Sequence, residues 1–207
     1  MKPAIGKLHV LTDTVLQSKY SHDDIARMAV DGGADTVQFR QKDGTSRDMY
    51  RNASAVLKIC RDAGVTMIVN DRIDIALAID ADGVHLGHED IPIPVARTLL
   101  GDGKLIGGSA TDLHGLRSVL PDGPDYVGLG PIYTTQSKRD AGPALGIAAL
   151  KKATAITSLP IIAIGGISAK RMPELLSTGI HGVAVISAVC CAPDPRRATR
   201  AFMAAFS

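Results

Sequence analysis

The chain has little of what a nucleic-acid-binding protein needs. It has no tryptophan, its aromatic residues make up 3% of the total, and 23 Lys and Arg residues nearly balance 21 Asp and Glu residues, leaving a net charge of +2. Proteins that bind nucleic acids usually present a basic face and stacking aromatic rings. The composition therefore argues against a nucleic-acid partner.

Cysteine is also scarce. The three cysteines are Cys60, Cys190 and Cys191. An odd number without CxxC or Cys/His spacing indicates neither a disulfide framework nor a zinc site. We expect the adjacent Cys190 and Cys191 to be reduced packing residues, as in most intracellular proteins.

Long apolar runs are missing as well. A membrane helix needs about 20 apolar residues, and no run in the chain approaches that length. The first residues, Met1 to Gly6, contain no apolar signal core. These absences predict a cytoplasmic protein with no membrane partner.

What the chain does have is a regular alternation of short apolar runs and helical patterns. Hydrophobic residues are 45% of its 207 residues, which is typical of a soluble globular protein with a sizeable core. The expected strands are 7–11, 36–40, 66–69, 83–86, 105–108, 126–129, 160–164 and 182–186. The expected helices, caps included, are 21–32, 46–63, 71–79, 93–100, 112–120, 147–157, 168–177 and 194–207. The second of these carries an apolar stripe at helical spacing, formed by Tyr50, Ala53, Val56, Leu57 and Cys60.

This order of elements predicts the fold class. Alternating strands and helices favour an α/β protein with a parallel sheet, and strands that are apolar throughout are expected when both faces are buried. Eight such units without a linker predict a single compact domain, residues 1–207, folded as a (β/α)8 TIM barrel. An open doubly wound sheet is the alternative, and the absence of GxGxxG after the first strand argues against it.

The stretch 126–138 combines a short apolar strand with the start of a long polar loop. Its apolar strand ends at Gly130 and Pro131, and a loop follows with hydroxyls on Thr134, Thr135 and Ser137 and a cation on Lys138. Hydroxyls beside a lysine suit an anionic, phosphorylated ligand. A loop of this length is often functional, although it could also be an ordinary solvated loop.

Active sites of such barrels form at the carboxyl ends of the strands. The second strand ends in Gln38, Arg40 and Lys42, which alternation puts on one side as three groups compatible with an anion. Asn70 and Asp71 follow the third strand, and Glu89 and Asp90 come after the fourth. Carboxylates and an amide are oxygen ligands of the kind that Mg2+ prefers, but on spacing alone Asp71 is better explained as a helix cap.

The later strand ends indicate a separate phosphate site. Ser109 ends the fifth strand, Gly165 and Gly166 follow the seventh, and Ser187 follows the eighth. Glycine amides and helix N-termini after strands seven and eight form the usual phosphate site of a barrel. Two anion sites and a divalent metal together suggest a diphosphate and a monophosphate substrate.

The chain shows no Ser-His-Asp arrangement. His85 and His88 fall near the expected mouth of the barrel, but neither has an evident role as a base, and we interpret both as structural or peripheral. The chemistry suggested by the residues is therefore anion binding and metal assistance.

Several stretches together resemble the thiamine-phosphate synthase family. The matching segments are 38–42, 69–71, 81–87, Asp90, 126–133, 164–167 and 182–187, and the resemblance covers about Leu8 to Phe206. Their order on successive strands makes the resemblance specific. It implies a transferase that joins a pyrimidine diphosphate to a thiazole phosphate, with pyrophosphate leaving first and the thiazole nitrogen capturing a pyrimidine-methyl cation.

The resemblance also implies residue roles. The pyrimidine diphosphate would be held by Gln38, Arg40, Lys42, Asn70, Ser109 and Lys138, among which Arg40, Lys42 and Lys138 are the expected catalytic cations. Asp71 and Asp90 would hold Mg2+ as the cofactor, and Thr135, Ser137, Gly166, Ile186 and Ser187 would hold the thiazole phosphate. Replacing Arg40 or Lys138 with alanine is expected to remove most activity without unfolding the protein.

The chain departs from the family pattern at four positions. His88 stands where Gln is common, Thr111 where His is common, Thr134 where Pro is common, and Ser137 where Thr is usual. A thiazole tautomerase of the same fold and a non-catalytic module that binds thiamine precursors are the alternatives. The tautomerase uses the His that Thr111 replaces and lacks several metal and diphosphate residues that this chain keeps, so the synthase is favoured. A homo-oligomer is compatible with all three.

Overall fold

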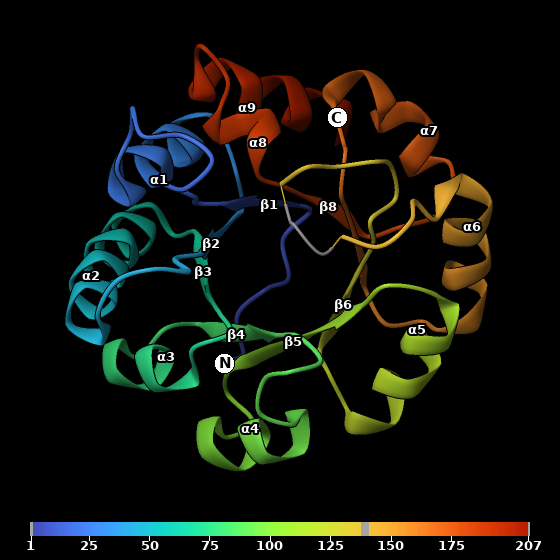
Figure 1. Ribbon diagram of the computed structural model, residues 1–207, viewed down its shortest axis with the longest axis horizontal. Helices are drawn as coiled ribbons and strands as arrows, with labels where there is room; N and C mark the ends of the chain where they lie inside the picture. Colours follow the sequence, from blue (N-terminus) through green and yellow to red (C-terminus); the bar gives the residue numbers. More distant parts are fainter. Residues whose placement is uncertain (1, 138–140, 207) are drawn as a thin grey trace.

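The strands close into a barrel surrounded by helices, as the sequence predicts. The computed structural model describes residues 2–137 and 141–206. In these residues eight parallel strands pair in chain order from β1 to β8, and β8 pairs with β1 to close the sheet. Figure 1 looks down the barrel and shows the helices as an outer ring. The α/β class and the TIM-barrel fold are confirmed.

The bounds of the elements follow the expected alternation. The strands are β1 Leu8–Leu11, β2 Thr36–Phe39, β3 Thr66–Asn70, β4 Gly83–Leu86, β5 Leu105–Ala110, β6 Tyr126–Leu129, β7 Ile161–Ile164 and β8 Gly182–Val185. The helices are α1 His22–Asp31, α2 Ser46–Ala63, α3 Ile73–Ile79, α4 Ile93–Leu100, α5 Leu113–Val119, α6 Gly146–Ile156, α7 Met172–Leu176, α8 Ser187–Cys190 and α9 Pro195–Met203. Short 3-10 turns occupy Leu120–Asp122, Ala169–Arg171 and Ala204–Phe206.

Local signals in the sequence explain where the helices begin and end. Ser21 caps α1 through a capping box with Asp24, and the carboxylates of Asp112 and Asp194 accept hydrogen bonds from backbone N–H groups in the first turns of α5 and α9. Gly64 ends α2 in the left-handed conformation with φ of 68°, which glycine adopts without steric penalty. Capping chemistry is local, so these boundaries can be read from the sequence.

Two expectations about the helices are wrong. Tyr50 is 48% exposed, and Met49, 6% exposed, takes its place on the buried face of α2. The segment after β7 starts as a 3-10 turn before α7, and Ser168 makes no side-chain capping bond with a described residue. The four-residue helix α8 directly after β8 was not expected.

The core has two parts, as a closed barrel requires. The larger cluster lies between the strands and the helices and includes Val10, Val37, Val69, Ala53 and Leu150. The smaller cluster fills the barrel itself and consists of Leu11, Tyr126, Ile162 and Ala184. Side chains therefore alternate between the inside and the outside of the barrel, and inside positions near the carboxyl ends of the strands face the mouth.

None of the helices in the described part of the chain is both long and apolar enough to cross a membrane.

Candidate active site

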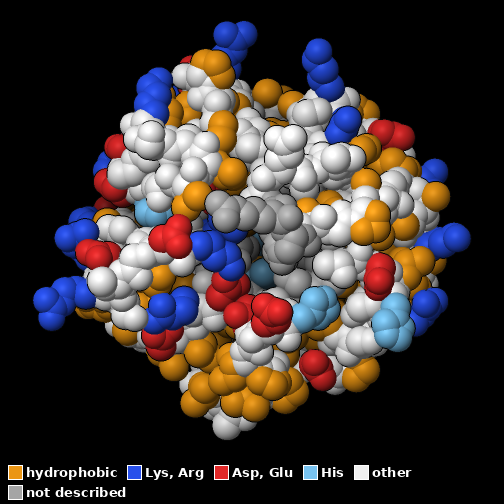
Figure 2. Space-filling model, viewed as in Figure 1, with side chains coloured by type: hydrophobic (Ala, Val, Ile, Leu, Met, Phe, Trp, Pro, Cys, Tyr) orange, Lys and Arg blue, Asp and Glu red, His pale blue; other side chains and the backbone are white. Residues whose placement is uncertain are grey.

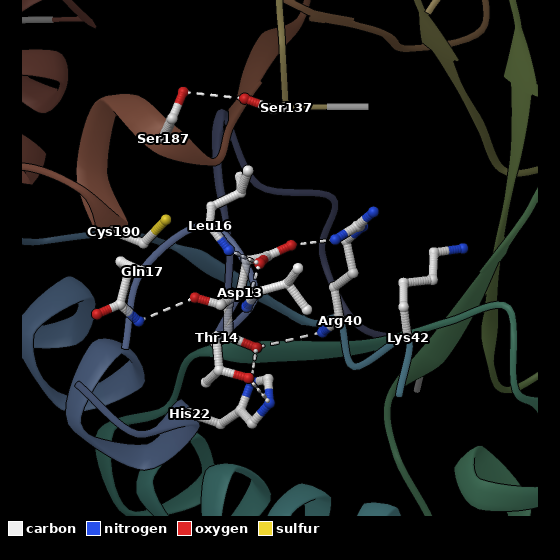
Figure 3. A network of polar contacts seen from close by, with 12 residues as sticks. Asp13, Thr14, Leu16, Gln17, His22, Arg40, Lys42, Ser137, Ser187 and Cys190 are labelled. Atoms are coloured by element: carbon white, nitrogen blue, oxygen red, sulfur yellow. Dashed lines mark hydrogen bonds and ion pairs between the residues drawn. The ribbon is translucent and has the colours of Figure 1, made fainter. Parts of the chain in front are cut away.

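The basic side of the candidate site begins where β2 ends. Gln38 lies in β2 and is 4% exposed, and Arg40 follows the strand as a partly buried residue. The Lys42 side chain is 45% exposed. Figure 3 shows the side chains of Arg40 and Lys42 extending in the same direction from this segment. The structure thus brings both cations to the mouth of the barrel.

Asp13, which sequence reasoning missed, holds the guanidinium group of Arg40. Arg40 Nη1 donates to Asp13 Oδ2, and the Asp13 side chain is only 1% exposed. The other carboxylate oxygen, Oδ1, accepts the N–H of Val15 at 2.8 Å and of Leu16 at 2.9 Å. With both oxygens engaged, the carboxylate cannot rotate freely, so it offers Arg40 a fixed anchor (Figure 3). Asp13 follows β1 as Arg40 follows β2, so the same attention to strand ends would have found it.

The β1–α1 loop is tied to the end of β2 by a second set of contacts. Thr12 Oγ1 accepts the backbone N–H of Arg40 at 3.2 Å and lies 2.8 Å from His22 Nδ1. Thr14 Oγ1 lies 3.4 Å from the other ring nitrogen, His22 Nε2. Burial lowers the pKa of His22 below its usual range, against the opposing effect of the Asp13 carboxylate. These bonds fix the backbone on which Arg40 stands.

Asp71 faces the cations instead of capping a helix. Its φ is 63°, a left-handed conformation that Asp tolerates better than most side chains, and its N–H donates to the His85 carbonyl at 2.9 Å. The residue that caps α3 is Arg72, and none of the described side chains makes a capping bond there. The capping explanation for Asp71 is therefore wrong. Its carboxylate accepts a hydrogen bond from Lys42 Nζ.

Asp90 lies beside Asp71 at the same edge of the mouth. Asp90 Oδ2 accepts the Gly87 N–H at 2.6 Å, which holds the carboxylate over its own turn. Burial raises the pKa of the Asp90 carboxyl above its ordinary value, the Gly87 N–H lowers it, and the nearby Asp71 carboxylate raises it again. Mutual repulsion of this kind is expected where two carboxylates converge.

This pair of carboxylates fits Mg2+. Magnesium in phosphate-handling enzymes is usually bound through one or two carboxylates, with waters and substrate phosphates completing its octahedron. No group of three or more His, Cys, Asp and Glu residues capable of holding a metal occurs in residues 2–137 and 141–206. A magnesium site at Asp71 and Asp90 would thus take its further oxygen ligands from other groups, such as amide or carbonyl oxygens, substrate phosphates or waters.

Asn70 and Ser109 line the barrel between the two sides. Asn70 is the last residue of β3 and pairs with His85 in the sheet register, and Ser109 lies in β5. Ser109 Oγ lies 2.9 Å from His85 Nε2, and both side chains are partly buried. His85, interpreted from sequence as structural or peripheral, is therefore a direct neighbour of a predicted substrate-binding residue.

The second side of the mouth is built from the loops after β6, β7 and β8. Gly165 and Gly166 have φ of 97° and 63°, which leaves their backbone free to turn sharply. The Gly166 carbonyl accepts Arg171 Nη1 at 2.6 Å, and the Arg171 guanidinium lies 3.9 Å from the centre of the Tyr133 ring. This clamp joins the turn after β7 to the loop after β6.

The predicted phosphate-binding residues meet across these loops. Ser137 Oγ donates to Ser187 Oγ at 3.0 Å (Figure 3), and Ser137 N–H donates to Thr135 Oγ1 at 3.2 Å. Ile186 is the N-cap residue of α8 and Ser187 its first residue. The first N–H groups of a helix lack intrahelical acceptors and suit an anion. Lys138 lies outside the described residues.

The charges at the mouth are complementary. In Figure 2, Lys and Arg side chains lie directly beside acidic side chains near the centre of this face. A cavity of about 620 Å³ occurs elsewhere, at the amino ends of the strands, lined by residues such as Lys7, Pro160, His181 and Phe206. That cavity contains none of the predicted site residues, so the cluster of charges at the mouth is the better candidate for the site.

Comparisons with known proteins agree on one family. A family model described as thiamine monophosphate synthase matches residues 8–189. A curated thiamine-phosphate synthase of Salinibacter ruber is 46% identical and covers 98% of this chain and 89% of its own length. That of Methanoculleus marisnigri is also 46% identical, over 93% and 92% of the two chains. The solved structure of a thiamine phosphate pyrophosphorylase from Pyrococcus furiosus superposes with a TM-score of 0.88 at 38% identity, over 96% and 94% of the chains.

Proposed function

The chain belongs to the thiamine monophosphate synthase family, and from this premise we propose that the residues at the barrel mouth join a pyrimidine diphosphate to a thiazole phosphate. The family and its curated members identify the chain as a transferase with thiamine-phosphate synthase activity. Its substrates are accordingly small molecules. The assignment of roles to individual residues is the part we propose.

The observation that carries this assignment is the pairing of cations with carboxylates at one side of the mouth. Arg40 contacts Asp13, and Lys42 contacts Asp71, which adjoins Asp90. A diphosphate bound here would replace Asp71 as the partner of Lys42 and approach the remaining donors of Arg40. Fixed cations stabilise the charge that develops on a departing pyrophosphate, which lowers the barrier. Lys138 has the same proposed role on the ground of resemblance.

Asp71 and Asp90 are the proposed ligands of Mg2+. When bound there, the metal would neutralise charge on the diphosphate and assist its departure. The protein's own contribution is to hold two carboxylates in place, one through the backbone turn at Gly87 and the other through the left-handed conformation of Asp71. Without a diphosphate, Lys42 compensates part of the carboxylate charge.

We assign the thiazole phosphate to the opposite side of the mouth. The backbone at Gly166, Ile186 and Ser187 supplies N–H groups, and Thr135 and Ser137 supply hydroxyls. Separate sites for the two phosphorylated substrates would direct the thiazole nitrogen toward the methylene carbon of the pyrimidine. Because that nitrogen carries no proton when it attacks, the reaction needs no general base, and capture of a pyrimidine-methyl cation is compatible with these residues.

The first experiment is synthesis of thiamine phosphate by the purified protein from the two phosphorylated precursors, with and without Mg2+. We expect product only when magnesium is present. Isomerisation of the thiazole phosphate without the pyrimidine diphosphate would favour the tautomerase, and binding of both precursors without turnover would favour a binding module. The expected cytoplasmic location and the homo-oligomer stay predictions, to be checked by fractionation and by light scattering.

The cation assignment is tested by alanine variants. We expect Lys138→Ala and Lys42→Ala to lose most activity, whereas Lys152→Ala, on the exposed surface of α6, serves as the matched control. Wild-type rates for both site variants would refute the assignment.

A further inference from the structure

Three polar side chains form a continuous chain inside the barrel. The Tyr126 hydroxyl lies 3.2 Å from His85 Nδ1, and His85 Nε2 lies 2.9 Å from Ser109 Oγ. They come from three adjacent strands, β6, β4 and β5. Tyr126 is 1% exposed, while His85 and Ser109 are partly buried toward the mouth. The chain therefore runs from the sealed interior to the candidate site.

Two glycines make room for the rings. A Cβ atom at Gly107 would lie 2.2 Å from Tyr126 Cζ and 2.5 Å from His85 Nδ1, and one at Gly128 would lie 2.9 Å from His85 Cε1. The sheet register pairs His85 with Gly107. Glycine weakens a strand and often marks a place where another group approaches the backbone closely. Glycine at both positions therefore makes room for the two rings, which a side chain there would displace.

Ring stacking holds the chain in place. The His85 and Tyr126 rings are stacked with centroids 5.5 Å apart, and the His9 ring packs edge-on with the Tyr126 ring, with centroids 5.4 Å apart. Aromatic pairs at such separations favour defined orientations. The hydroxyl of Tyr126 is consequently held toward His85.

The directions of the two hydrogen bonds follow from the partners that each group can reach. Burial raises the pKa of the Tyr126 phenol, so its O–H is present and needs an acceptor inside the barrel. A neutral imidazole has one donor and one acceptor nitrogen. Among the hydrogen bonds of the described residues, His85 Nδ1 is the one partner of the Tyr126 hydroxyl, so Nδ1 must be the unprotonated nitrogen that accepts. Nε2 therefore carries the proton and donates it to Ser109 Oγ.

The reverse arrangement is less favourable. If Ser109 donated to Nε2, then Nδ1 would carry the proton and donate to the Tyr126 oxygen, and the phenolic O–H would be left without an acceptor among residues 2–137 and 141–206. A buried donor without an acceptor gives up its hydrogen bonds to water and gains none in return, which destabilises this arrangement. The first arrangement instead leaves the hydroxyl proton of Ser109 free to point into the mouth.

We propose that Tyr126 and His85 are positioning residues that make Ser109 a hydrogen-bond donor to the pyrimidine diphosphate. The proposal rests on the proposed function, which assigns Ser109 to that substrate. It specifies the chemistry of the contact: Ser109 meets an acceptor, such as a ring nitrogen or a phosphate oxygen, and does not bind the amino group. Neither positioning residue needs to touch the substrate.

A double-mutant cycle tests the proposal. The variants are Ser109→Ala, Tyr126→Phe and their combination, with Tyr50→Phe on the exposed face of α2 as the matched control for loss of a hydroxyl. In Tyr126→Phe the acceptor nitrogen loses its donor, so His85 can exchange its proton and draw the Ser109 hydroxyl away from the substrate. We expect roughly a three- to tenfold loss of kcat/KM for the pyrimidine diphosphate, the value of one neutral hydrogen bond. The KM for the thiazole phosphate should not change.

Non-additivity distinguishes positioning from packing. Because Tyr126 acts through Ser109, the double variant should be no worse than Ser109→Ala. Losses that multiply, or a Tyr126→Phe variant equal to Tyr50→Phe, would overturn the proposal. His85→Gln provides a second test. The glutamine amide can donate to Ser109 without a hydrogen bond from Tyr126. Activity should therefore be kept in His85→Gln, and adding Tyr126→Phe to it should cause no further loss.

The outcome separates this proposal from the proposed function. Binding of the pyrimidine diphosphate alone, measured by titration calorimetry, should show the same pattern among the variants even if turnover is absent. A Ser109→Ala variant that binds and reacts like the wild type would overturn the placement of Ser109 and this proposal with it. A defective Ser109→Ala beside an unaffected Tyr126→Phe would overturn only the proposal.

Discussion

The ion pair between Asp13 and Arg40 makes the sharpest prediction about stability. The Asp13 side chain is 1% exposed and that of Arg40 is 14% exposed. Removing one partner of a buried pair typically costs about 3–5 kcal/mol. In Asp13→Asn we expect about 2 kcal/mol, because Arg40 can turn toward solvent at the mouth and asparagine can still accept from Val15 and Leu16. For a chain of this length the melting temperature should fall by about 4–8 °C.

Asp31→Asn is the matched control. Asp31 also pairs with an arginine, Arg196, at 2.8 Å, but the two side chains are 42% and 49% exposed. Exposed pairs contribute about 0.2–1 kcal/mol. Urea unfolding measures the free energy of unfolding of both variants, and unchanged m-values show that only stability has changed. If the two free energies of unfolding agreed within about 0.5 kcal/mol, the reasoning that Asp13 is a buried anchor would be refuted.

The same pair changes what is expected of Arg40→Ala. From sequence, this variant is expected to lose activity without losing its fold. The structure adds a consequence, because removing Arg40 leaves the Asp13 carboxylate buried without its cation. We expect Arg40→Ala to lose both activity and stability, and Asp13→Asn to raise the KM for the pyrimidine diphosphate by letting Arg40 turn away.

The remaining predictions concern the charges, the metal, the packing and the pH response. Lys42→Ala should lower kcat about 100-fold. It should cost less than about 1 kcal/mol of stability, because the Lys42 side chain is 45% exposed. Rate assays and melting curves measure the two effects. Excess EDTA should abolish turnover and added Mg2+ restore it; full activity in EDTA would remove the metal from the mechanism. Gly107→Ala should destabilise by about 1–3 kcal/mol or more through overpacking, whereas Gly103→Ala, whose Cβ meets nothing within 4 Å, should not. Burial lowers the pKa of His9 from 6.5 to about 3, so the unfolded chain takes up the proton first and stability should fall by up to about 1.4 kcal/mol per pH unit below pH 6.5. A His9→Gln variant with an equally steep fall would refute that assignment.

Much of the fold follows from local signals in the sequence. Gly64 ends α2, and Asp112 and Asp194 begin α5 and α9, because capping involves residues only a few positions apart. Short apolar strands separated by these helices are compatible with few topologies, and eight of them favour closure. Tyr50 shows the limit of the helical pattern: Met49 and Tyr50 are neighbours, and only packing against other elements decides which is buried.

The location of the candidate site was also predictable, because strand ends meet at one face of a parallel barrel. Arg40, Lys42, Asp71 and Asp90 do converge there. What these side chains bind remains a prediction from the resemblance.

The contacts between these side chains were decided by the tertiary structure alone. Asp13 and Arg40 are 27 residues apart, Lys42 and Asp71 are 29 apart, and Ser137 and Ser187 are 50 apart. No local rule assigns partners at such separations, because the choice depends on the register of the strands and the turns that follow them. The chain itself thus specified which residue types stand at the mouth of the barrel. Only closure of the barrel determined which of them touch, since it brings neighbouring strand ends within reach of one another's side chains.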